Sequence, residues 1–255
     1  VALKLARCGH RGDLMREAEV LAAISHPAVL RYHDSGVVAN TWYLATELVS
    51  GTRLDLWQSQ PQSWPALVTA YMRAGIGLSA VPRAGYVHRD FKPSNVIVVE
   101  DHAVRLIDLG LAKPPTSRVR SRPTARALRR VLAEHYSRLT SGRRPRSAGT
   151  PSYMAPEQWL GLPTDERADQ YSFCAATYEA LHCRDGCRRW VANREQTSPT
   201  AFGSLDPAAV PDELTEILRR GMATYPDDRW PDMDALLIAM AQAMTRRARP
   251  RGYPV

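Results

Sequence analysis

The chain has 255 residues, of which 44% are hydrophobic and 24% are charged. These values are typical of a folded globular protein, and the length suffices for one large domain or for two lobes that share a cleft. No apolar run approaches the roughly 18 residues of a membrane span, so we expect no membrane segment in this chain, although a parent protein could carry one. The four cysteines are too few and too unevenly spaced for a disulfide framework, which favours a reducing, cytoplasmic setting.

The net charge of +8 comes from one segment. Ten arginines and a single acid lie between Pro115 and Arg146, which leaves the rest of the chain at about −1. Tyr136 is the only aromatic residue of that segment, so base stacking has little to work with. We therefore expect a solvated basic loop and no nucleic-acid partner, with binding to an acidic surface as the alternative.

The first 51 residues predict a small β-rich region. A short β-type run opens the chain at 1–4, and apolar residues at helical spacing predict an amphipathic helix over 13–24. Two strands are expected at 29–32 and 41–48, joined by a turn around Ser35-Gly36 and Ala39-Asn40. Gly51 ends this pattern.

From Leu54 onward the apolar residues recur with the helical period. Helices are predicted over 54–57, 66–80, 165–181, 212–223 and 233–243. The sequence therefore predicts an α+β fold in which a small β-rich lobe precedes a large helical lobe.

The segment from His88 to Asn95 carries the clearest chemistry. It reads His-Arg-Asp-Phe-Lys-Pro-Ser-Asn, and Asp108-Leu109-Gly110 begins 13 positions after Asn95. Phosphoryl transfer needs an acceptor for a hydroxyl proton, a cation that meets the phosphate, and Asn and Asp ligands for a divalent metal. The segment and Asp108 supply all of these groups. They predict transfer of the terminal phosphate of ATP.

Taken in order, the motifs resemble those of the eukaryotic-type (Hanks-type) Ser/Thr protein kinases in the form widespread among bacteria. Val1-Ala2-Leu3-Lys4 is similar to the third-strand Lys motif, Glu17 to the acid of the following helix, and His88–Asn95 to the catalytic loop. Asp108-Leu109-Gly110 is similar to the metal-binding motif, and Gly149-Thr150 with Ala155-Pro156-Glu157 to the close of the activation segment. The resemblance extends from Val1 to about Met244 and implies the bilobal kinase fold.

The resemblance assigns catalytic roles. Asp90 would accept the proton of the substrate hydroxyl, Lys92 would steady the transferring phosphate, and Asn95 with Asp108 would bind Mg²⁺. The place of Lys92 in the loop is that of Ser/Thr kinases and differs from the Ala-Ala-Arg arrangement of tyrosine kinases. Protein substrates are therefore expected to be modified on Ser or Thr.

The resemblance also implies an ATP site. Lys4 would neutralise the α and β phosphates, held by an ion pair with Glu17, which is preferred to Glu19 because it lies ten residues before Pro27. The residues expected around adenine are Thr46 as gatekeeper, the backbone of Glu47 and Val49, and Ala2 and Ile97 against the two faces of the ring.

Four further roles follow from the same resemblance. Asp169 is expected to brace the catalytic loop, and Glu157 to pair with Arg229. Arg89 and Thr150 are assigned to substrate binding and activation, with Arg89 pairing a phosphate on the activation segment. Thr140 and Ser147 are the favoured autophosphorylation sites, and phosphorylation there is expected to raise activity.

The resemblance also implies how the chain divides into lobes. Residues 1–48 correspond to the N-lobe, 49–51 to the hinge, 52–244 to the C-lobe and 245–255 to a basic tail. Relatives carry a Gly-rich loop before the Lys strand and none precedes Lys4, so we expect a truncated N-lobe. From Asp108 to Glu157 is about twice the usual length, and the surplus coincides with an Arg-rich insert at 115–146.

Two functions compete with the kinase. A pseudokinase would use the same fold as a binding or scaffolding module, and the absent Gly-rich loop favours it. Degenerate kinases tend to lose at least one of Lys4, Asp90, Asn95 and Asp108, and all four are present. The third function, a binder of nucleic acid or acidic surfaces, would use the Arg-rich insert and would show strong salt dependence.

Overall fold

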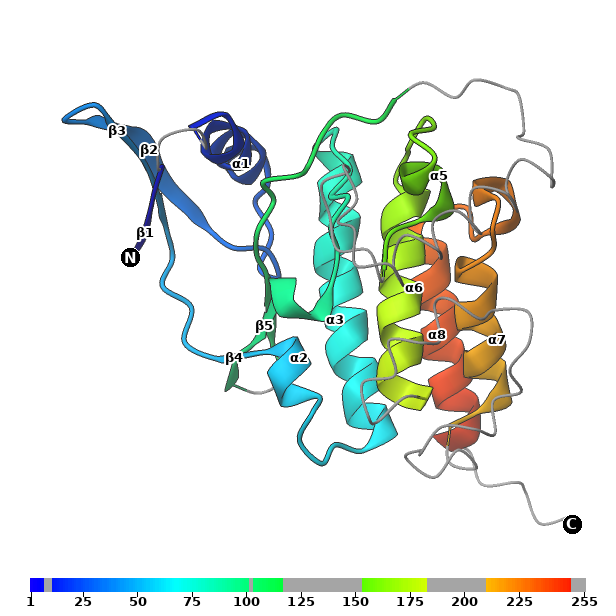
Figure 1. Ribbon diagram of the computed structural model, residues 1–255. Helices are drawn as coiled ribbons and strands as arrows, with labels where there is room; N and C mark the ends of the chain where they lie inside the picture. The colour runs from blue at the N-terminus through cyan, green and yellow to red at the C-terminus, as the bar shows by residue number, and fades with distance from the viewer. Residues whose placement is uncertain (7–10, 101–102, 117–152, 183–209, 249–255) are drawn as a thin grey trace, which may run out of the picture.

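The computed structural model describes residues 1–6, 11–100, 103–116, 153–182 and 210–248. Strands and one helix make up the N-terminal part, and helices make up most of the remainder (Figure 1). This is the α+β order that the sequence predicts. Within the described ranges, no helix is both long and apolar enough to cross a membrane.

The first sheet has three antiparallel strands in the order β1-β3-β2. They are β1 (Ala2–Leu5), β2 (Tyr32–Val38) and β3 (Thr41–Thr46). Ala39 and Asn40 connect β2 to β3 with φ of 47° and 61°. Two consecutive left-handed residues form the tight turn whose twist matches a β-hairpin, so this turn lies where the sequence predicts it.

The prediction of a strand over 29–32 and a turn at Ser35-Gly36 is wrong. β2 runs straight through Gly36, which pairs with Tyr43 across the hairpin. A Cβ atom on Gly36 would lie 3.2 Å from the Tyr43 ring, so this glycine makes room for an aromatic neighbour and not for a turn. Val29 forms only an isolated bridge to Leu106, and the second strand ends at Thr46, two residues before the predicted end.

Helix α1 (Arg11–Ala23) packs beside this sheet. Its buried residues Leu14, Ala18 and Leu21 follow the helical period that predicts it, and they join the main hydrophobic core. Glu17 lies on the same buried face, whereas Glu19 is exposed. The helix therefore carries a carboxylate into the interior at one position.

A second small antiparallel sheet has the order β4-β5-β6, with β4 (Thr52–Arg53), β5 (Val96–Val98) and β6 (Val104–Leu106). β5 follows the 3-10 turn η1 (Pro93–Asn95) directly. The β5–β6 pairing continues into the site, because the Asn95 carbonyl accepts a 2.8 Å hydrogen bond from the Ile107 amide. Asn95 and Asp108 are brought together by this hairpin.

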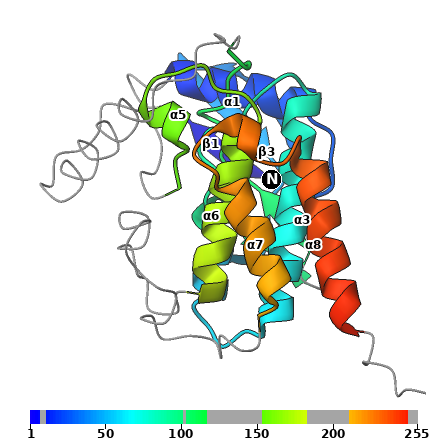
Figure 2. The ribbon, with the colours of Figure 1, turned by 90° about the vertical axis from the view of Figure 1, so that its right-hand side faces the viewer.

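The helical part is built around α3 (Trp64–Arg83) and α6 (Arg167–His182), with α7 (Asp212–Gly221) and α8 (Met233–Ala248) packed against them (Figures 1 and 2). Two short helices, α2 (Leu54–Trp57) and α5 (Pro156–Trp159), and the 3-10 turn η6 (Pro226–Asp228) complete the described elements. All five predicted helices are present. α3 extends three residues past its predicted end and is followed by Gly85 with φ of 86°.

An aromatic cluster connects the helical core to the catalytic loop. Phe91, from the loop, lies 5.7 Å from Phe173 of α6 between ring centroids, and Phe173 lies 6.2 Å from Tyr71 of α3. All three side chains are almost completely buried. Since buried aromatic rings supply large apolar contact areas, this cluster fixes the loop to the two central helices.

Candidate active site

Asp169, in the first turn of α6, holds the backbone of the catalytic loop. Its two carboxylate oxygens accept hydrogen bonds from the backbone amides of His88 and Arg89, both at 2.7 Å. Burial raises the pKa of Asp169 to about 7, and the two amide donors act in the opposite direction. The expected brace is present in the geometry, and it fixes two consecutive peptide groups of the loop.

The loop backbone is strained at Arg89. This residue has φ of +68°, a left-handed conformation that costs free energy for a non-glycine residue. Beside it, the neutral ring of His88 accepts a 3.3 Å hydrogen bond from the Asp90 amide through Nδ1. Burial lowers the pKa of His88, so this histidine acts as a structural acceptor.

Asp90 contacts two polar side chains, those of Lys92 and Asn95. Its Oδ2 atom is 2.7 Å from Lys92 Nζ, and its backbone carbonyl accepts a 3.0 Å hydrogen bond from Asn95 Nδ2. Asp90 is buried, with 8% of its surface exposed. Lys92 and Asn95, the other two residues that the sequence nominates for catalysis, therefore each lie within hydrogen-bonding distance of Asp90.

Lys4 and Glu17 form the ion pair that the sequence predicts. Lys4 Nζ on β1 lies 2.6 Å from Glu17 Oε2 on α1. Burial is the largest influence on the pKa of Glu17 and raises it, Lys4 lowers it, and the charge of Asp108 raises it further. Lys4 itself is 57% exposed at the side chain, so its ammonium group faces open space as well as the carboxylate.

A cavity of about 410 Å³ lies beside the catalytic loop. A second cavity, of about 280 Å³, lies beside the Lys4–Glu17 ion pair. The smaller one is lined by Lys4, Glu17, Asp108 and Gly110 among others. A Cβ atom on Gly110 would lie 3.4 Å from Asp108 Oδ1 and 3.8 Å from Glu17 Oε2. Two carboxylates and one ammonium group thus line a common cavity, and groups of these kinds bind cations and phosphates respectively.

The donor set fits a magnesium ion. Asp108 has φ of +63° and an exposed carboxylate, while Leu109 beside it is fully buried and anchors the turn. The Asn95 amide nitrogen is engaged by the Asp90 carbonyl, which leaves the amide oxygen for a metal. Mg²⁺ is bound by oxygen ligands, commonly one or two from protein together with substrate phosphates.

Comparison with known proteins assigns the family. The family described as "Protein kinase domain" matches residues 1–230. The chain belongs to the protein kinase family. Its relatives include the serine/threonine-protein kinase Pkn1 of Myxococcus xanthus, which is 29% identical over 94% of this chain and 34% of Pkn1. The serine/threonine-protein kinase PknH of Mycobacterium tuberculosis is 28% identical over 92% of this chain and 35% of PknH.

The solved structures agree on the fold. The kinase domain of Mycobacterium tuberculosis PknI, in a singly substituted form, superposes with a TM-score of 0.61, covering 95% of this chain and 84% of that one at 22% identity. The resemblance seen in the motifs is thereby confirmed, as is the bilobal kinase class. The chain spans about a third of the length of the curated relatives it matches.

The residues assigned to adenine come from β1, β3, β5 and the connection that follows β3. Ala2 on β1 is the register partner of Thr46 on β3, and Ile97 is on β5. The Glu47 carbonyl accepts a 3.3 Å hydrogen bond from the Thr46 hydroxyl, and a carbonyl oxygen retains a second lone pair. Val49 follows on the connection toward β4 and is half-buried.

Gly51 explains how this connection reaches β5. A Cβ atom at Gly51 would collide with the Val98 carbonyl oxygen and would lie 2.8 Å from Ile97 Cγ2. No other residue permits that approach without displacing β5. The connection that follows Val49 is therefore pressed against the strand that carries Ile97.

The Glu47 side chain has a role that sequence reasoning did not find. Its Oε1 atom accepts a 2.9 Å hydrogen bond from the Arg31 amide and a 3.0 Å hydrogen bond from Arg105 Nε on β6. This contact ties the connection between the two sheets to β6. The sequence offers no local signal for it, because Glu47 and Arg105 are 58 positions apart.

Arg89 borders the larger cavity, together with Lys113, Thr116, Gln158 and Thr164. Its guanidinium group donates a 3.2 Å hydrogen bond to the Pro114 carbonyl, and burial lowers the pKa of Arg89. Thr150, Thr140, Ser147 and most of the Arg-rich insert lie outside the described residues. Their assigned roles in activation stay predictions.

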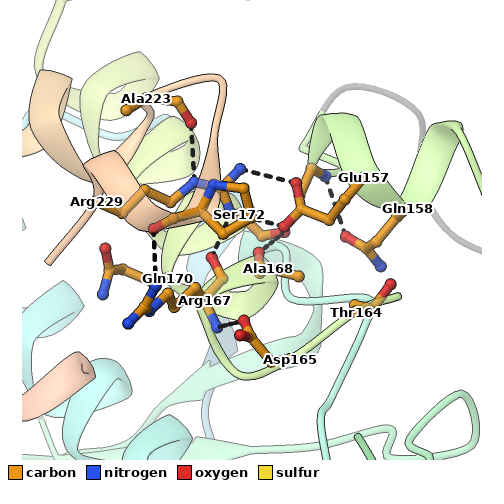
Figure 3. A network of polar contacts seen from close by, with 12 residues as sticks. Glu157, Gln158, Thr164, Asp165, Arg167, Ala168, Gln170, Ser172, Ala223 and Arg229 are labelled. Atoms are coloured by element: carbon orange, nitrogen blue, oxygen red, sulfur yellow. Dashed lines mark hydrogen bonds and ion pairs between the residues drawn. The ribbon is translucent and has the colours of Figure 1, made fainter. Parts of the chain in front are cut away.

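The Glu157–Arg229 pair joins α5 to the residue that follows η6. Arg229 Nη1 and Nη2 donate to the two oxygens of Glu157 at 2.7 and 2.8 Å (Figure 3). Arg229 also donates to the backbone carbonyls of Ala223 and Arg167. The pair is almost fully buried, so it anchors α5 to the helical core by charge-assisted bonds in a dry environment.

Proposed function

We propose that this chain is the catalytic domain of an ATP-dependent protein serine/threonine kinase. The observation that carries the proposal is the convergence of Asp90, Lys92 and Asn95 on one loop with Asp108 beside them. The Lys4–Glu17 pair lines the same cavity as Asp108. Among the described residues, the candidate base, the two lysines and the candidate metal ligands of phosphoryl transfer are all present, which favours catalysis over a scaffold.

The chain's own residues would have the following roles in phosphoryl transfer. Asp90 would orient the substrate hydroxyl and accept its proton. Lys92, 2.7 Å from Asp90, would offset the charge on the transferring phosphoryl group. Asn95 and Asp108 would hold Mg²⁺, which supplies charge neutralisation of the nucleotide phosphates when bound. Asp108 has a left-handed backbone conformation and lines the same cavity as Lys4.

Glu17 would aim the Lys4 ammonium group at the phosphates. A lysine on a flexible four-carbon chain is poorly directed without such a partner. Burial raises the pKa of the Glu17 carboxyl group, and the ion pair with Lys4 offsets part of that effect. α1 thereby contributes to nucleotide binding although it contacts no substrate itself.

The proposed function predicts Mg²⁺-dependent transfer of labelled γ-phosphate from ATP to serine or threonine of a protein substrate. Incubation of the purified protein with labelled ATP and a general acceptor such as casein, followed by phosphoamino-acid analysis, measures it. Label confined to tyrosine would contradict the substrate class. Nucleotide binding without transfer, across several acceptors and without autophosphorylation, would favour the scaffold.

Two matched helix substitutions test the ion pair. Glu17→Gln is expected to lower kcat/KM for ATP about tenfold, because the loss of one charged hydrogen bond leaves Lys4 undirected. Glu19→Gln, on the exposed face of the same helix, is expected to leave it within about twofold. Initial rates at varied ATP decide the comparison. Equal values for the two variants would exclude the role of Glu17.

A further inference from the structure

The side-chain amide of Gln158 connects α5 to the catalytic loop. Its Oε1 atom accepts a 3.0 Å hydrogen bond from the Ala155 amide, and its Nε2 atom donates a 2.9 Å hydrogen bond to the Arg89 carbonyl. Gln158 is the third residue of α5, where a glutamine side chain can fold back to the helix N-terminus. Both ends of the amide are used, each in the role that its chemistry permits.

The Arg89 carbonyl belongs to the peptide group that enters the catalytic aspartate. The amide on the other side of Arg89 is held by Asp169 at 2.7 Å, and the Asp90 amide is held by His88 Nδ1 at 3.3 Å. Gln158 supplies the contact on the carbonyl oxygen. Because Arg89 has φ of +68°, this peptide group is strained and needs such contacts to keep its orientation.

The helix that carries Gln158, α5, is anchored by the residue before it, Glu157. Glu157, the preceding residue, makes two hydrogen bonds to Arg229, as Figure 3 shows, while Gln158 turns away from Arg229 toward Thr164. α5 is therefore anchored on one side to the helical core through Glu157. On the other side it reaches the catalytic loop, 69 positions earlier in the chain, through Gln158.

We propose that Gln158 is a positioning residue that sets the orientation of Asp90 by holding the Arg89–Asp90 peptide group. The inference rests on the proposed kinase function. An uncharged amide fits both contacts, because it offers one acceptor to the Ala155 amide and one donor to the Arg89 carbonyl. A carboxylate would place a second acceptor against that carbonyl, and a thioether would offer no donor.

The proposal is tested with Gln158→Met and Gln158→Glu. Each is expected to lower kcat about tenfold at pH 8 and to leave KM for ATP within about twofold, because Gln158 acts on the base and not on the nucleotide. Gln62→Met is the control, since the Gln62 amide also donates to a backbone carbonyl, that of Trp57 at 3.3 Å, away from the catalytic loop. Its kcat is expected to equal that of the wild type.

The pH profile separates positioning from mere stability. Lowering the pH from about 8 to about 6 protonates part of the carboxyl introduced by Gln158→Glu, which restores a donor for the Arg89 carbonyl. The kcat of that variant, divided by the wild-type kcat at each pH, is expected to rise. The same ratio for Gln158→Met is expected to stay flat.

Three outcomes would overturn the inference. Wild-type kcat in both Gln158 variants would show that the contact has no catalytic effect. A loss of kcat that tracks a loss of folded protein by circular dichroism would show a structural role alone, and so would matching pH ratios for the two variants. Absence of transfer by the wild-type protein would instead refute the proposed function, so the two failures are distinguishable.

Discussion

Asp90→Asn and Asp108→Asn are each expected to lower phosphoryl transfer by at least about 10³-fold. A positioned general base contributes about 10² to 10⁴ in rate, and removal of a metal-binding carboxylate weakens neutralisation of the phosphates as well. Asparagine preserves the size of each side chain, so the packing around Leu109 and Phe91 stays intact. Single-turnover transfer of labelled phosphate from ATP gives the rates.

The metal dependence distinguishes the two variants. Asp108→Asn is expected to need more Mg²⁺ for half-maximal transfer, whereas Asp90→Asn is expected to lower the rate at every Mg²⁺ concentration. Asp212→Asn, at an exposed aspartate in the first turn of α7, is the control and should be fully active. Transfer that persists in both site variants would exclude the proposed mechanism, since neither base nor metal ligand would then be required.

Breaking the Glu157–Arg229 pair is expected to cost the largest share of stability. Arg229→Met should lower the free energy of unfolding by about 3 to 5 kcal/mol, because it leaves the Glu157 carboxylate buried without its partner. It also removes the donors to the Ala223 and Arg167 carbonyls. Urea denaturation followed by circular dichroism measures the change.

The double variant tests whether the unpaired charge causes that loss. Glu157→Leu combined with Arg229→Met removes both charges, and it is expected to be more stable than Arg229→Met alone. An additive loss in the double variant would show that the two side chains act independently. A loss below about 1 kcal/mol in Arg229→Met would contradict the importance of the buried pair.

For α1, the sequence predicted the helix and the ion-pair residue, and the structure shows why that residue is the one that pairs. The helical spacing of Leu14, Ala18 and Leu21 predicted the helix, and spacing within the kinase family favoured Glu17 as the partner of Lys4. Only the structure shows the physical basis of that choice. Glu17 lies on the buried face at 2.6 Å from Lys4, whereas Glu19 points to solvent.

The wrong prediction of a turn at Ser35-Gly36, which lies inside β2, has a local cause. Ser35-Gly36 has the composition of a turn, and turn propensity is a property of the residues themselves. The ring of Tyr43 lies opposite Gly36 across the hairpin, and the small size of Gly36 meets the requirement for space beside that ring. That requirement comes from a strand pairing, which the sequence around Gly36 does not contain.

The sequence by itself predicted the chemistry, because phosphoryl transfer demands particular residue types at close spacing. Asp90, Lys92 and Asn95 lie within eight consecutive positions, and Asp108 follows 13 positions after Asn95. It also determined the long helices, whose apolar period is repeated over several turns. The tertiary structure alone decided the contacts of Glu47 with Arg105 and of Gln158 with the Arg89 carbonyl. Those contacts join residues 58 and 69 positions apart, and a hydrogen bond depends on where two atoms meet in space, which local sequence patterns do not record.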